Sequence, residues 1–190
     1  DPWVGGFAML LSRRSNSDYT QHHQIFIDRR TSSWTGCCAD GQPSAVLYMG
    51  GGGDAGSKFA VSGPLVTGEW IQITFTISDG SICPYVNGRR NGDCSAPIAD
   101  SDRQIGSGEP LEVGGEDSYT DHPLWSMASL MYYNRALSDA EVLANKQASN
   151  CIEMGLHPDA SCPTSFIYDA GMTTEPIDCL SGAAGAVEVA

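Results

Sequence analysis

A chain of 190 residues can bury one sizeable core but is short for two domains of ordinary size. Its formal net charge of -13 repels the phosphates of nucleic acids and anionic membrane surfaces, so neither is expected as a partner. No apolar run approaches the roughly 18 residues of a membrane span. Asp1 stands where an initiator Met would be, so we expect a processed chain or a fragment.

Seven cysteines indicate a disulfide framework, because they show neither CxxC pairs nor the His spacing of a structural zinc site. They are Cys37, Cys38, Cys83, Cys94, Cys151, Cys162 and Cys179. Reducing cytosol would not maintain such bridges, so we expect a secreted protein that works outside the cell or at its surface. The odd count leaves one thiol free or pairs it with another chain.

From Phe7 onward, short apolar or alternating segments are separated by turn-forming clusters, which is the pattern of β-strands. The predicted strands span residues 7–11, 24–27, 45–49, 59–62, 70–77 and 82–86. Their spacing is typical of a sandwich of antiparallel sheets. Trp70 begins the most apolar of these strands, and we therefore expect it in the core.

Residues 85–89, YVNGR, predict a tight β-hairpin. Asn87 and Gly88 supply the two positive φ angles that a type I′ turn requires, so they form a two-residue tip. This register brings Cys83 close to Cys94 across the base of the hairpin, and we predict a disulfide between them.

Downstream, residues 111–115 form another apolar segment, and residues 124–133 a further one. One short helix follows at about residues 138–147. Ser138 is its predicted N-cap, and Glu141 three residues later completes a capping box.

The chain changes character at residue 150, where proline, cysteine and small residues become frequent. We therefore divide it into a β-sandwich domain, residues 1–149, and a disulfide-tied extension, residues 150–190. Cys151 is predicted to pair with Cys162, and Cys179 with either Cys37 or Cys38.

Four phrases occur in an order that resembles the laminin G-like or concanavalin A-like jelly-roll family. They are GEWIQITFTISDG (68–80), YVNG (85–88), LEVGG (111–115) and MYYNRALSDAEV (131–142). The resemblance covers residues 7–147. It implies an all-β jelly roll in which the last phrase is a final strand leading into the capped helix, with ligand loops on one rim or one concave face. The family usually has a strand before the position of Phe7, so here a first strand is missing or comes from elsewhere.

Three aromatic residues in loops or at segment ends are candidates for stacking on a sugar ring. They are Trp34, Tyr119 and Trp125. Partial burial under the rim of the sandwich is the alternative for each of them.

Acidic loops could supply hard oxygen ligands to Ca²⁺, which rim loops of this fold often hold. The candidates are Asp100, Asp102, Glu116, Asp117 and Asp121. The alternative is that they are ordinary solvated loops of an acidic protein, since Ca²⁺ needs six or more converging oxygens. No cofactor is required by any pattern in the chain.

Enzymatic activity is not expected. Glycan-cleaving enzymes of this fold carry Glu-x-Asp-x-x-Glu on one strand, because an acid and a nucleophile must flank one bond, and that pattern is absent. There is no G-x-S-x-G nucleophile elbow either.

The tail contains Ala186-Val187-Glu188-Val189, whose alternation suits a strand with one buried face. A sheet that lacks an edge strand can accept such a segment. We therefore expect a non-catalytic extracellular structural or adhesive module that forms homo-oligomers or filaments. This tail either enters the next copy, which propagates the contact, or folds back on its own subunit and completes a monomer. A lectin-like module that binds glycans or extracellular proteins is the alternative, and a glycoside hydrolase is a third hypothesis.

Overall fold

The computed structural model describes residues 7–14, 22–30, 41–50, 58–66, 68–98, 111–114 and 129–153. The chain divides into two compact units, residues 1–124 and 125–190. Within the described segments, the first unit holds two antiparallel β-sheets and the second holds one helix, which confirms the expected mainly antiparallel β-sandwich. No helix in those segments is long and apolar enough to cross a membrane.

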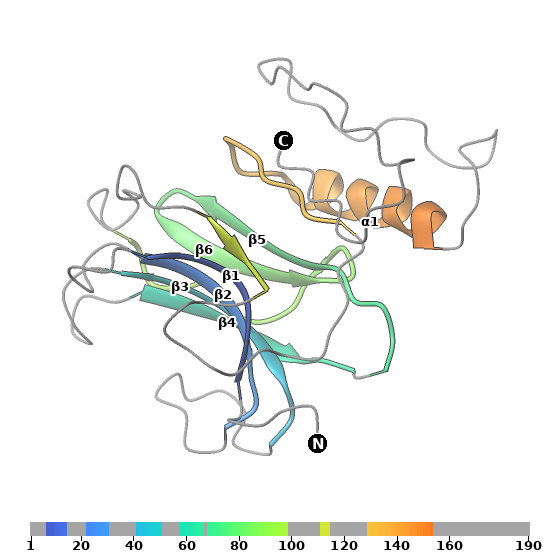
Figure 1. Cartoon of the computed structure of the whole chain (residues 1–190). Helices are drawn as coiled ribbons and strands as arrows, with labels where there is room; N and C mark the ends of the chain where they lie inside the picture. Colours follow the sequence, from blue (N-terminus) through green and yellow to red (C-terminus); the bar gives the residue numbers. More distant parts are fainter. Residues whose placement is uncertain are drawn as a thin grey trace. The chain divides into compact units, whose positions relative to one another are not determined.

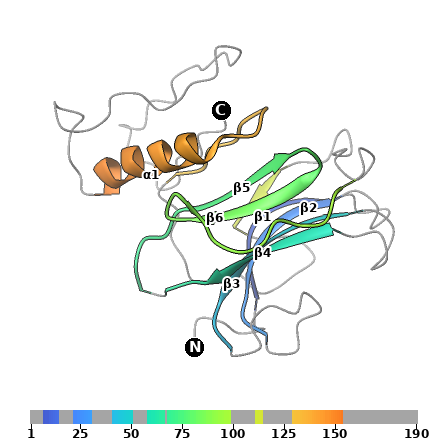
Figure 2. The ribbon, with the colours of Figure 1, turned by 180° about the vertical axis from the view of Figure 1, so that it is seen from behind.

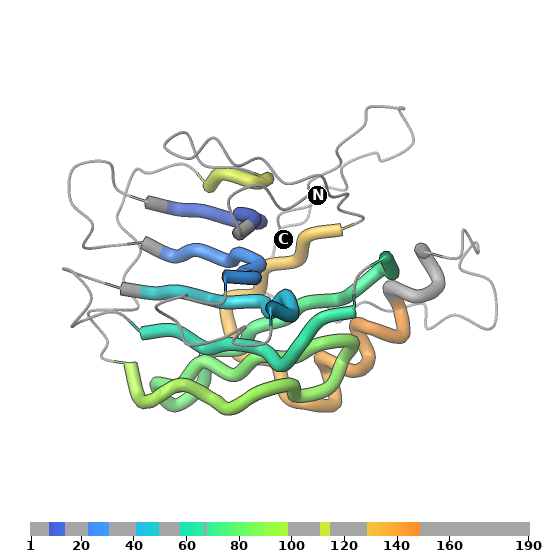
Figure 3. The backbone as a smooth tube through the Cα atoms, turned by 90° about the horizontal axis from the view of Figure 1, so that it is seen from below, coloured from blue at the N-terminus to red at the C-terminus, as the bar shows by residue number. Residues whose placement is uncertain are grey.

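The larger sheet has five strands in the order β4-β3-β2-β1-β8 (Figures 1 and 3). Their bounds are β1 (Phe7–Arg14), β2 (His22–Asp28), β3 (Ser44–Gly50), β4 (Lys58–Pro64) and β8 (Glu112–Val113). All neighbours are antiparallel, and bulges interrupt the register between Met9 and Leu11 and between Ser44 and Val46. The segment predicted at residues 111–115 is thus a strand, and it borders β1.

The smaller sheet has three strands, β5 (Ile73–Ser78), β6 (Ser81–Val86) and β7 (Arg89–Arg90), in that order. Two-residue turns connect them. Asn87 and Gly88 have φ angles of 52° and 79°, which confirms the predicted type I′ hairpin, and Asp79 and Gly80 repeat the pattern at 48° and 80°. In both Figures 1 and 2 the β5–β6 hairpin lies across the larger sheet.

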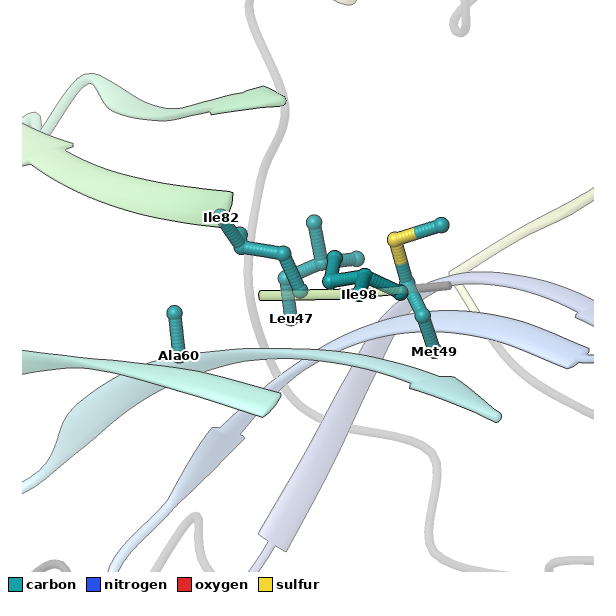
Figure 4. Close-up of a cluster of buried hydrophobic side chains, with 5 residues drawn as sticks. All are labelled: Leu47, Met49, Ala60, Ile82 and Ile98. Atoms are coloured by element: carbon teal, nitrogen blue, oxygen red, sulfur yellow. The ribbon is translucent and has the colours of Figure 1, made fainter. Parts of the chain in front are cut away.

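The core lies between the sheets and is built from alternate residues of each strand. One cluster, drawn in Figure 4, contains Leu47, Met49, Ala60, Ile82 and Ile98. A second contains Ala8, Ile27, Ala45 and Leu65. Phe75 of β5 packs against both clusters, so the two sheets share one continuous interior.

The opposite face of the larger sheet is also apolar, and its centre is closed to solvent. Met9, Phe26 and Val46 lie side by side on β1, β2 and β3 and are 3%, 4% and 0% exposed. Tyr48 and Val61 pack beside them. The sheet is therefore buried on both faces, unlike the usual antiparallel sheet with one solvated face.

The two sheets are joined at one corner, where the edge of β4 meets the chain leaving β7. The backbone N–H of Gly63 donates to the carbonyl of Asn91 at 3.1 Å, and Asn91 N–H donates to Pro84 O at 3.0 Å. Gly92 sits at φ 113° in this corner, so close to β4 that a Cβ on it would lie 2.3 Å from the carbonyl oxygen of Val61. This contact pairs the end of β4 near Gly63 with backbone from the chain after β7.

In the second unit, helix α1 spans Asp139–Glu153 and extends beyond the expected end at residue 147. Its predicted capping box is confirmed, because Ser138 N–H donates to the Glu141 carboxylate at 2.8 Å and Glu141 N–H donates to Ser138 Oγ at 3.4 Å. The expected start of the extension, residue 150, falls inside this helix, and residues 154–190 lie outside the described part of the chain.

The final strand implied by the phrase at 131–142 is not formed, since residues 129–138 have no strand pairing. Their side chains bond to the helix and to one another instead. Asn145 of α1 donates to the Tyr133 hydroxyl at 2.9 Å, and that hydroxyl donates to the sulfur of Met131 at 3.4 Å. The segment is therefore held by its contacts with α1.

Candidate functional site

Most residues predicted as sites fall outside the described segments, and the structure leaves these predictions untested. They comprise the aromatic candidates Trp34, Tyr119 and Trp125, the acidic candidates Asp100, Asp102, Glu116, Asp117 and Asp121, and the tail residues Ala186, Val187, Glu188 and Val189. The cysteines Cys37, Cys38, Cys162 and Cys179 and the side chain of Cys151 also fall outside them. Among the residues that the structure does describe, no group of three or more His, Cys, Asp or Glu residues could hold a metal ion.

The disulfide between Cys83 and Cys94 is present, with an S–S distance of 2.04 Å and Cα atoms 4.3 Å apart. The chain beside it is hydrogen-bonded back to β6, since Ser95 N–H donates to Ile82 O at 2.8 Å and Ile82 N–H donates to Ser95 Oγ at 2.9 Å. The bridge thus closes the base of the hairpin as the Asn-Gly register predicts.

Two arginines make ordered contacts that the sequence analysis did not anticipate. Arg90 donates to the Tyr85 hydroxyl at 3.2 Å, with its guanidinium carbon 5.6 Å from the ring centroid. Arg30 donates from Nε and Nη2 to both carboxylate oxygens of the fully buried Asp28, each at 2.9 Å. The contact of Arg30 could have been predicted from the sequence, because an acidic residue stands two positions before an arginine at the end of an apolar strand. The charge of Asp28 is thus buried and paired, whereas Arg90 lies at an exposed position.

Trp70 is not in the core, and the sequence prediction for it was wrong. It is 52% exposed on the connection between β4 and β5, where Val66 is 63% exposed. Ile71, Ile73 and Phe75 pack inward, so strand alternation directs Trp70 to the opposite side. The connection therefore presents an aromatic face to solvent.

The β1 edge of the larger sheet is only partly occupied. β8 pairs with Leu11 and Ser12, and Gly114 N–H donates to Leu10 O at 3.0 Å. No strand among the described residues borders the first three residues of β1 on this side. On this side of β1, the described residues thus pair only with Leu10, Leu11 and Ser12, and the first three residues of β1 have no partner strand within the described segments.

The family model that matches this chain is that of the concanavalin A-like lectin/glucanases superfamily, with the laminin G type, over residues 13–143. The chain belongs to this superfamily. The matched residues run from the end of β1 to the first residues of α1 and include the hairpin, the disulfide and the capping box. As its description says, the superfamily holds both lectins and glucanases, so membership does not by itself assign a chemistry.

Among solved structures, the chain is similar to an S-layer domain-containing protein from Clostridium thermocellum (residues 221–444). The identity is 18%, the match covers 75% of this chain and 64% of that one, and the TM-score is 0.31. The chain therefore spans less than two thirds of that structure. No curated protein matches the sequence.

Proposed function

We propose that this member of the superfamily is a non-catalytic extracellular module that assembles with copies of itself at a cell surface or in a fibril or matrix. The disulfide between Cys83 and Cys94 supports an oxidising location. The observation that supports the assembly is the edge of β1 at residues 7–9, which has no partner strand among the described residues.

A strand edge without a neighbour presents unpaired N–H and C=O groups to any extended segment. β1 has eight residues and β8 only two, so no described strand lies beside the end of β1 that begins at Phe7, and a short strand could add there. The tail residues 186–189 match this need in length and in alternation. When the tail of one copy adds to β1 of the next, the contact is head-to-tail and propagates as a filament.

Deleting residues 180–190 tests the tail directly. We expect the molar mass of the particles, measured by multi-angle light scattering, to fall to that of a small species that does not propagate. Val187→Asp with Val189→Asp should act like the deletion, because it places charge on the face that must be buried. Glu188→Gln lies on the opposite face and is the matched control. Particles of unchanged size after the deletion would exclude tail exchange.

The second candidate function is glycan binding, and the exposed ring of Trp70 favours it. A glycan array should then show binding that Trp70→Ala removes and that Val66→Ala, on the same connection, leaves in place. Release of sugars from polysaccharides by the purified chain would contradict the proposal that it is non-catalytic.

A further inference from the structure

Among the residues that the structure describes, β5 is the last strand of the smaller sheet. β5 pairs with β6 from Ile73 to Ser78, and no strand among the described residues borders its other side. Apart from the ladder with β6, residues 73–78 make no backbone hydrogen bond with any other described residue. Within the described part of the chain, the outer edge of β5 thus has no hydrogen-bonded neighbour.

The direction of each backbone group on β5 follows from the bonds at the hairpin. Asn87 N–H donates to Gln72 O at 2.9 Å, so the main chain of Gln72 faces β6. Strand geometry alternates this direction, so the N–H and C=O groups of Ile73, Phe75 and Ile77 face outward.

The hydrogen bonds on the other side of β6 indicate the same orientation for the backbone groups of β5. Ile82 O and Pro84 O accept bonds from the chain beyond β7 and so face away from β5. Their partners across the ladder are Ile77 and Phe75. Pro84, which has no N–H, occupies one of these positions without costing the β5–β6 ladder a bond.

The residues of β5 itself include none of the features that usually block pairing at a strand edge. β5 reads ITFTIS, with no charge, no proline and no bulge, and every residue but the last is β-branched or aromatic. Such residues favour strands, and an open edge of this composition pairs readily with another strand. Its occupant must be a strand that fits the same register.

The sequence of β5 identifies that strand. Residues 73–77, Ile-Thr-Phe-Thr-Ile, read the same in both directions about Phe75. In an antiparallel pair of two such strands centred on Phe75, the outward groups of one copy meet those of the other, and about six backbone hydrogen bonds form. Ile73 then faces Ile77 of the other copy, Phe75 faces Phe75, and Thr74 faces Thr76. Aromatic pairs and threonine pairs are favourable across strands.

We propose that two copies of this chain pair through β5 about a two-fold axis, which joins their smaller sheets into one six-stranded sheet. The contact is isologous, because the same surface is used by both copies. Ile73, Phe75 and Ile77 already pack on the core of their own copy, so the joined sheet continues that apolar face across the axis.

This dimer does not depend on the tail. It uses the smaller sheet, whereas tail exchange uses β1 of the larger one, so each can fail alone. Together, a closed two-fold contact and a propagating contact would link head-to-tail filaments side by side.

Thr74→Lys tests the dimer. Thr74 is half-buried on the side of the sheet opposite the core, and its main chain faces β6, so lysine adds a charge at the edge without removing a ladder bond. With residues 180–190 deleted, sedimentation over a range of concentrations should show a monomer–dimer equilibrium. The substitution should weaken it at least tenfold. Ala96→Lys adds the same charge at an exposed site beyond β7 and should leave it unchanged.

Amide hydrogen exchange gives a second measurement that does not depend on the variant folding. In the unsubstituted chain, the amides of Ile73, Phe75 and Ile77 should become protected as concentration rises, while those of Thr74 and Thr76 stay protected throughout. A monomer at all concentrations would overturn the proposal, as would protection of all five amides in the monomer, which would mean that the chain covers its own edge. Loss of the dimer on tail deletion would assign the contact to the tail and also overturn it.

Discussion

The corner between the two sheets gives the sharpest test of the fold, through the substitution Gly92→Ala. Gly92 has φ 113°, a conformation that residues with a Cβ rarely adopt. The added methyl would also lie 2.3 Å from Val61 O and 3.3 Å from the Cα of Ser62, both backbone atoms of β4. Because backbone cannot swing aside as a flexible side chain can, either β4 or the chain after β7 must move.

The expected cost has two parts. The positive φ costs about 1–2 kcal/mol for a residue with a Cβ. Forcing a methyl into a closely packed site costs about 1–3 kcal/mol more. We expect Gly92→Ala to lower the free energy of unfolding by about 3 kcal/mol. The hydrogen bond from Gly63 to Asn91 at the same corner should weaken with it.

Gly68→Ala is the matched control. Gly68 has φ 85°, but nothing lies within 4 Å of the position of its Cβ, so only the conformational cost of about 1 kcal/mol applies. Both substitutions change the entropy of the unfolded chain equally, so this effect cancels in the comparison. Urea unfolding followed by Trp fluorescence measures both. Equal losses for the two variants would refute the close approach of β4 to the chain after β7.

Replacing Cys83 and Cys94 together by Ala opens a loop with a sequence separation of 11 and should lower the free energy of unfolding by about 3 kcal/mol in urea; no loss would mean that the bridge does not restrict the unfolded chain. Ile82→Ala empties a fully buried site and should cost about 3 kcal/mol in the same assay, and a cost below about 1 kcal/mol would contradict its place in the core. The bidentate bond from Arg135, with bonds from Ser138, lowers the pKa of Glu141 from 4.5 to about 2, so its contribution to stability is complete above pH 4.5 and is lost as pH falls toward 2. A carboxyl carbon titration by NMR should show this midpoint, and Arg135→Ala should raise it; an unchanged midpoint would count against the ion pair.

The elements that could be predicted from the sequence are those determined by a few adjacent residues. Asn87 and Gly88 need no distant contact to form their turn, and the disulfide follows from the register that this turn sets. Ser138 and Glu141 cap α1 in the same local way. Turn and cap chemistry acts within four or five residues, so the printed sequence contains all of its information.

Other features depend on packing between segments, and there the sequence was ambiguous. The place of Trp70 at the start of an apolar strand predicts that it is buried. Its side chain points outward, because alternation along the chain turns Ile71 and Ile73 toward the core and Trp70 away from it. The final strand expected near Tyr133 needs a neighbouring strand, and the hydrogen bond from Asn145 engages that residue instead. The loops that contain the predicted aromatic and acidic sites lie outside the described residues, so those predictions stay predictions.

The two apolar faces of the larger sheet bear on how its strands find their alignment during folding. In a sheet with one solvated face, a register slip of one residue moves the buried apolar side chains into solvent, and the slipped pairing is therefore unstable. Here a slip of β2 would exchange Phe26 for Ile27, one apolar side chain for another. Asp28 removes this degeneracy, because the slip would move its carboxylate, together with the bonded Arg30 two residues later, to the inner face beside Ala8, where a charged pair would replace apolar packing. This buried acid thus favours one register in a sheet whose two apolar faces alone would not distinguish it.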